Sequence, residues 1–74
     1  MLWKSDGEYQ ELFDGDLKIA AYGPNPYGMM GQGWTRAWFF QDNGKLAATM
    51  VTLDPDKARR WCLEQADRRE VARD

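Results

Sequence analysis

The sequence predicts an α+β domain in which an antiparallel β-meander of three to four strands carries one C-terminal α-helix packed on the sheet. Two turns rich in Asp, Asn and Gly lie between β-prone segments, which is the pattern of β-hairpins. A helix start signal and helical spacing of apolar residues appear only after residue 53. Strands followed by a single helix favour one sheet with the helix across it.

The first half of the chain reads as two strands and a turn. Residues 8–13 are expected to form a strand, and residues 2–4 could pair beside it. Asp14-Gly15-Asp16 then predicts a hairpin turn, because Gly accepts a positive φ. Residues 17–22 form the next predicted strand, and alternation places Leu17, Ile19 and Ala21 on one face.

Residues 34–41 are rich in aromatic side chains and are expected to form a central strand. Alternation places Trp34, Arg36, Trp38 and Phe40 on one face, and Thr35, Ala37 and Phe39 on the other. Core packing under the helix is the favoured interpretation of this strand, but rings occur on both faces, and any rings left exposed would mark a binding surface. Asp42-Asn43-Gly44 repeats the turn pattern, and residues 45–51 close the meander.

The helix is predicted from its first residues. Asp54 suits the N-cap, Pro55 suits the first helical position, and Asp56 favours the positive end of the helix dipole. The apolar stripe consists of Ala58, Trp61, Cys62 and Ala66, with Trp61 expected to anchor the helix under the sheet. Residues 67–70 are polar on all sides and are expected to fray or extend into solvent. The chain is thus read as one domain, 1–74, with a sheet over 1–51, a long loop at 23–33 and a helix over 54–72.

Catalytic chemistry finds little support among the residue types. The chain contains no His, so Cys62 has no imidazole to activate it, and its place on the apolar stripe favours buried packing. The Asp14/Asp16 pair brackets a turn glycine and the Asp54/Asp56 pair caps a helix, which explains both pairs without a metal. We therefore expect a non-enzymatic protein with no metal and no cofactor.

Composition restricts the setting and the partners. The net charge of −2 does not favour general affinity for nucleic acid, which requires a strongly cationic surface. A single Cys allows no internal disulfide, and neither a signal peptide nor an apolar run of the roughly 20 residues that span a bilayer is visible. A cytoplasmic protein with no membrane partner is the expectation.

The stretch between Tyr22 and Trp34 is longer than a strand connection requires. Hairpin connections normally take about two to five residues, whereas this one holds eleven and includes Gly23-Pro24 and Pro26-Tyr27-Gly28 as turn signals. Met side chains adapt to irregular partner surfaces. The candidate binding residues are Tyr22, Asn25, Tyr27, Met29, Met30, Trp34 and Arg36. The alternative is that this stretch folds back over the open end of the sheet.

The order of the predicted elements is similar to that of a known class of small proteins. A leading Trp with an acidic Gly turn, a W-x-x-x-W strand, an Asn-Gly hairpin and L-D-P-D-K-A-R-R-W-C on a helix resemble small accessory proteins of phages and prophages, including anti-CRISPR and other anti-defence inhibitors. The resemblance implies occlusion of a larger host protein. The expected function is accordingly a binding protein acting as inhibitor or adaptor, with homodimer formation left open. A nucleotide- or metabolite-sequestering protein is the alternative, and single-stranded nucleic-acid binding on the aromatic strand is the third hypothesis.

Overall fold

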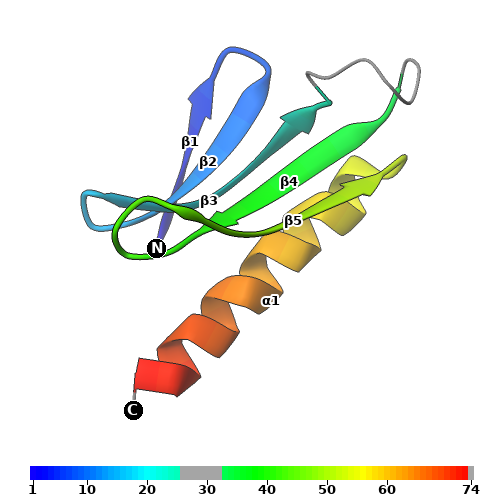
Figure 1. The fold of residues 1–74 in the computed structure, drawn as a ribbon. Helices are drawn as coiled ribbons and strands as arrows, with labels where there is room; N and C mark the ends of the chain where they lie inside the picture. Colours follow the sequence, from blue (N-terminus) through cyan, green and yellow to red (C-terminus); the bar gives the residue numbers. More distant parts are fainter. Residues whose placement is uncertain (26–32, 74) are drawn as a thin grey trace.

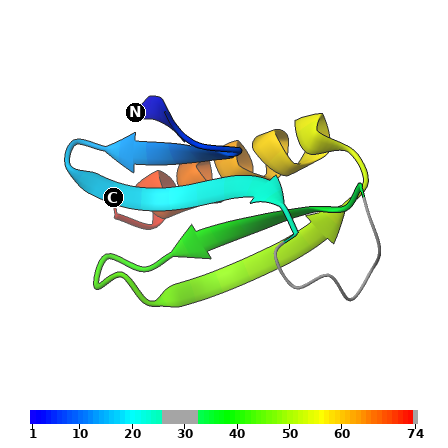
Figure 2. The same ribbon diagram turned by 90° about the horizontal axis from the view of Figure 1, so that it is seen from above.

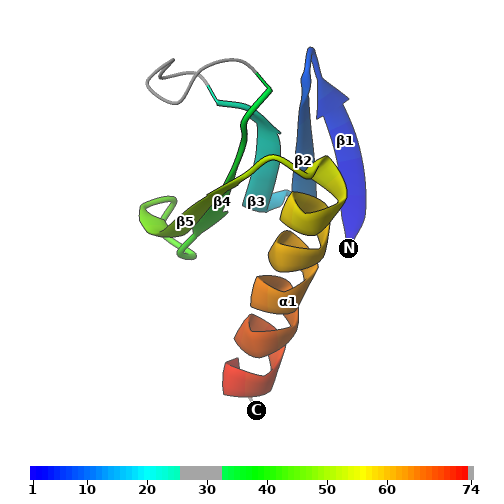
Figure 3. The same cartoon turned by 90° about the vertical axis from the view of Figure 1, so that its right-hand side faces the viewer.

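The computed structural model describes residues 1–25 and 33–73 and has five strands and one helix (Figure 1). The elements are β1 (Leu2–Asp6), β2 (Tyr9–Asp14), β3 (Leu17–Pro24), β4 (Thr35–Phe40), β5 (Leu46–Thr52) and α1 (Pro55–Arg73). All strands are antiparallel and lie in chain order in one sheet. The predicted α+β layout is confirmed, and Figure 3 shows the sheet curving around the helix.

The strand count is five, rather than the predicted three to four, because the N-terminal segment pairs along its whole length. β1 runs antiparallel to β2 from Leu2 opposite Phe13 to Asp6 opposite Tyr9. Gly7 has a φ of 61° in the turn between them, a conformation that Gly adopts without steric cost. The possible pairing of residues 2–4 is confirmed and extends to Asp6, where the polar residues gave no strand signal.

A bulge between β2 and β3 changes which residues face the helix. The register shifts after Leu12, so that Leu12 lies opposite Ala20 while Phe13 lies opposite Lys18. One extra residue in β3 lets Ile19 and Ala20 both lie in the core. The predicted face of Leu17, Ile19 and Ala21 was therefore wrong beyond Ile19, because the bulge reverses the alternation.

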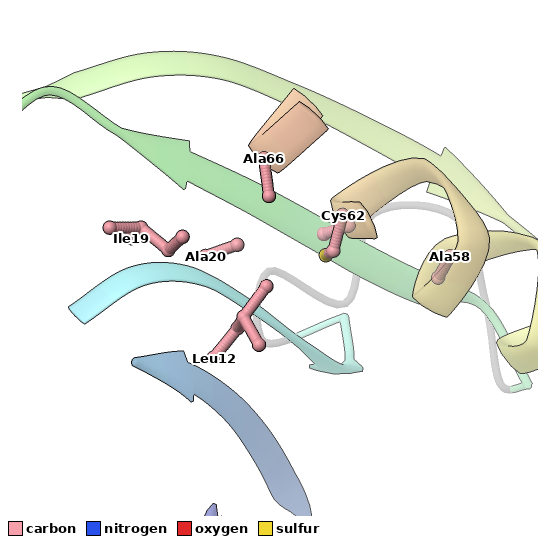
Figure 4. Close-up of a cluster of buried hydrophobic side chains, with 7 residues drawn as sticks. Leu12, Ile19, Ala20, Ala58, Cys62 and Ala66 are labelled. Atoms are coloured by element: carbon pink, nitrogen blue, oxygen red, sulfur yellow. The ribbon is translucent and has the colours of Figure 1, made fainter. Parts of the chain in front are cut away.

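The helix approaches the sheet closely through three small residues. Ala58, Cys62 and Ala66 recur every four residues, are fully buried, and join Leu12 and Ile19 in the core (Figure 4). At the helix start, a carboxylate oxygen of Asp54 accepts a hydrogen bond of 3.0 Å from the Asp56 amide, as the predicted N-cap requires. Figure 2 shows the helix lying on one side of the sheet.

Trp61 is not the anchor that the sequence indicated. Its side chain is only partly buried and packs beside the core, next to Met50 of β5. Trp3 takes a similar flanking place on the β1 side, where its ring meets Tyr22 edge to face at 5.5 Å and carries the Arg59 guanidinium at 4.6 Å. Because the helix lies close to the sheet on small residues, the large rings are displaced to either side of it.

The helix continues to Arg73, and Asp67 and Arg68 are exposed as expected, but Arg69 is held against the sheet and neither frays nor extends into solvent. The Arg69 side chain is only 9% exposed and bonds Asp42 at 2.7 Å and Asp14 at 3.1 Å. These carboxylates lie at the β4–β5 turn and at the end of β2. The charged run was misjudged because the two acidic partners are distant in sequence. The hydrogen bonds that Arg69 donates, chiefly to Asp42 and also to Asp14, raise the pKa of Arg69 and keep its guanidinium charged.

Candidate binding surface

The sheet face away from α1 carries four half-buried aromatic rings. Strand register places Tyr9 and Phe13 of β2 and Trp38 and Phe40 of β4 on this side. Among residues 1–25 and 33–73, α1 is the sole element outside the sheet, and it lies on the other side (Figure 2). We call this set, Tyr9, Phe13, Trp38 and Phe40, the aromatic face. The exposed side chains of Leu2 and Leu46, 59% and 50% accessible, flank it on the outer strands.

Tyr9 is held flat against the sheet by a glycine. A Cβ atom at Gly23 would overlap the Tyr9 ring, so only Gly leaves room for the ring over β3. The Tyr9 hydroxyl donates a 2.9 Å hydrogen bond to the Pro24 carbonyl, and the ring lies 5.9 Å from that of Trp38. Gly23 and Pro24 were predicted as a turn, and the structure instead places them at the end of β3.

Cationic side chains stand among the rings. The Lys4 ammonium lies 4.6 Å from the centre of the Phe13 ring, and the Lys18 ammonium lies 5.6 Å from that of Phe40. Lys18 also forms a 2.9 Å ion pair with Glu11 in the middle of the face. The surface thus combines apolar rings with charges of both signs, and it is not uniformly positive.

Two of the predicted binding residues meet at one end of the aromatic face. Arg36 lies beside Gly23 in the register, and its Nε donates to the Asn25 side-chain oxygen at 3.2 Å. The backbone N–H of Asn25 donates to the Trp34 carbonyl at 2.9 Å. These contacts join the described ends of the 22–34 stretch to the aromatic face. Tyr27, Met29 and Met30 lie outside the described residues.

Tyr22 does not share this surface. It lies opposite Ala37 on the helix side of the sheet, where its ring packs against Trp3 and the core. Asn25, Trp34 and Arg36 therefore lie together, and Tyr22 lies on the opposite face. Tyr9 and Phe13 were missed by sequence reasoning, because only the pairing of β2 through β3 places them beside Trp38. The Y-x-E-x-F alternation in β2 was the available signal.

A second, smaller feature is a groove between α1 and β5. It has a volume of about 280 Å³ and is lined by Met50, Lys57, Arg60, Trp61 and Glu64. Small-molecule sites commonly enclose about 300–1,000 Å³ and bury most of their ligand. A shallow groove of this size gives little support to the nucleotide or metabolite alternative.

The described residues contain no cluster of three or more metal-ligating side chains. Cys62 is fully buried, as predicted, and its thiol donates a weak 3.6 Å hydrogen bond to the Ala21 carbonyl. Burial raises the pKa of the Cys62 thiol from 9.0 to about 12, which opposes nucleophilic behaviour. Within the described part of the chain, no helix is long and apolar enough to cross a membrane.

Comparison with known proteins finds no similar protein. No protein-family model, curated protein or solved structure matches this chain.

Proposed function

We propose that this chain is a non-enzymatic binding protein that covers part of a larger protein and acts as an inhibitor or adaptor. The observation that carries the proposal is the aromatic face: four half-buried rings on one five-stranded sheet, on the side away from the one described helix. Tyr, Trp, Phe and Arg are the residues most enriched where proteins contact one another. The cytoplasmic setting and the phage-type role suggested by the resemblance belong to the same proposal.

The energetic reason for preferring a contact role is that these rings contribute less to folding than core rings do. Phe39, Tyr22 and Trp3 pack against the buried cluster, whereas Trp38 and Phe40 face the other way. Apolar area left in water gains about 25 cal/mol for each Å² that a partner later covers. A partner with a flat apolar surface and scattered charges would fit the rings, Lys18 and Glu11 together.

The test is capture of a partner from host lysate by the intact chain, followed by affinity measurement with the captured protein. Trp38→Ala is expected to weaken binding at least tenfold, about 1.4 kcal/mol, because central aromatic residues dominate interface energies. Leu63→Ala is the matched control, since Leu63 is also partly exposed but lies on α1. Thermal melts of both variants must show that each remains folded.

The outcomes separate the alternatives. Equal capture by both variants would contradict a partner on the aromatic face. Steep weakening with added salt, with nucleic acid recovered on the bait, would favour single-stranded nucleic-acid binding. A rise in melting temperature with an added nucleotide would favour the sequestering alternative.

A further inference from the structure

We propose that β5 pairs with β5 of a second copy of this chain, forming one continuous sheet across a two-fold axis. Among the described strands β5 has β4 as its sole neighbour, so one side of its backbone has no strand beside it. Such an edge presents N–H and C=O groups that can pair with another strand, and natural proteins usually protect it with charges, prolines or short length.

The two edge strands of this sheet differ in that protection. β1 has five residues and carries Lys4 and Asp6. β5 has seven residues, LAATMVT, without a charge or a proline. The bulge opposite Phe39 and Phe40 affects just the beginning of β5, and the part from Ala48 to Thr52 pairs regularly with β4. An unprotected regular edge of this length is suited to strand addition.

The groove beneath β5 indicates the kind of partner. Its apolar part is Met50 and the half-buried Trp61, and its charged part is Lys57, Arg60 and Glu64. A two-fold axis at β5 would bring two such grooves face to face and cover both Trp61 rings. It would also run the two helices antiparallel, so that Lys57 of one copy lies toward Glu64 of the other. A surface with both charge signs along its length is complementary to itself, as an isologous contact requires.

This inference does not depend on the proposed function. β5 pairing uses the sheet edge and the helix side, whereas the aromatic face lies on the opposite side. A two-fold axis perpendicular to the sheet keeps both aromatic faces on the same side. The dimer would therefore display two copies of that surface side by side.

Sedimentation velocity from low micromolar to submillimolar concentration tests the pairing. The intact chain is expected to reach twice its mass of 8.6 kDa. Thr49→Lys, at the exposed position within the regularly paired part of β5, should return the protein to a single chain, and a thermal melt should show that this chain remains folded. Ser5→Lys makes the same kind of change on the β1 edge and should leave the dimer intact.

A single-chain mass at every concentration would overturn the proposal, as would equal loss of dimer in both lysine variants. A cysteine scan gives an independent measurement. In antiparallel pairing about a two-fold axis perpendicular to the sheet, one β5 residue lies opposite itself. One single-cysteine variant between positions 47 and 51 should therefore oxidise readily to a linked dimer, since cross-strand Cα atoms lie within the roughly 7 Å that a disulfide spans. A dimer that cross-links at none of these positions would show a different interface.

Discussion

Gly23 illustrates how one residue without a side chain fixes the position of another. Its missing Cβ makes room for the Tyr9 ring, which in turn lies beside Trp38 on the aromatic face. The role is steric and depends on a neighbouring strand, which is why the sequence alone indicated a turn at this position. The aromatic face is therefore partly built by a glycine.

Gly23→Ala is expected to destabilise the fold by about 1–3 kcal/mol, because the new methyl group overlaps the Tyr9 ring. In a Tyr9→Ala background, the same change should be neutral or stabilising, since Ala restricts the unfolded backbone more than Gly. Urea denaturation of the four proteins in this double-mutant cycle measures the coupling. A cost at Gly23 that persists without the Tyr9 ring would show that its cause is the backbone.

Cys62 is expected to lower the stability of the folded protein in alkaline solution. Burial raises its folded pKa to about 12, above the ordinary thiol value of 9.0. Between these values the folded thiol keeps a proton that the unfolded chain has lost. The stability that comes from burying the neutral Cys62 thiol is fully present below pH 9. As the pH rises from 9 towards 12, the free energy of unfolding should fall by about 1.4 kcal/mol per pH unit.

Cys62→Ala is the comparison for this pH effect. The variant should be less stable at neutral pH, because it leaves a small cavity, but its stability should fall less steeply in alkaline solution. Every other group is common to the two proteins and cancels in the difference between their slopes. Chemical denaturation at several pH values above neutrality gives the two slopes, and parallel slopes would contradict the assignment.

The helix is the element whose beginning and end differ most in predictability. Asp54-Pro55-Asp56 signals its start within three residues, because capping is local chemistry. Its far end depends on Arg69 reaching Asp14 and Asp42, which belong to other elements. Local turn residues such as Gly15 and Gly44 were equally predictable, with φ values of 64° and 86° in the structure.

Arg69→Ala is expected to cost about 1–3 kcal/mol of stability, since it removes charge-assisted hydrogen bonds from a largely buried guanidinium. Arg68→Ala removes the same charge from an exposed position of the same helix and should change stability by less than about 0.5 kcal/mol. Thermal or urea unfolding compares the two. Arg69→Lys should recover only part of the loss, because an ammonium cannot reproduce the guanidinium fork. Equal effects at positions 68 and 69 would show that the contacts with Asp14 and Asp42 contribute nothing.

At the scale of the whole molecule, the sequence anticipated the layering and only part of the binding surface. Alternation in residues 34–40 correctly separated Arg36, Trp38 and Phe40 from Ala37 and Phe39. The contribution of β2 required knowledge of strand order and of the bulge at Leu12. Pairing between strands is a long-range property, so the alternation in β2 could place Tyr9 and Phe13 on one face but could not place Tyr9 beside Trp38.

The 22–34 stretch gives a test that involves the molecule as a whole. If Tyr27, Met29 and Met30 contact a partner, changing all three to Ser should leave the melting temperature nearly constant and weaken partner binding at least tenfold, or about 1.4 kcal/mol. If they instead cover the end of the sheet, the same change should destabilise the fold by several kcal/mol. Binding per folded molecule would then be unchanged. Measuring melting and binding on the same triple variant separates the two hypotheses.

The order of the elements has a consequence during synthesis. Each strand pairs with its immediate neighbour in the chain, so the hairpins can form as soon as their turns leave the ribosome. The core, however, needs Ala58, Cys62 and Ala66, which are translated after every strand. A nascent chain that has completed β5 therefore exposes both faces and both edges of its sheet. We expect this interval, before α1 emerges, to be when the chain is most prone to aggregate and most dependent on chaperones.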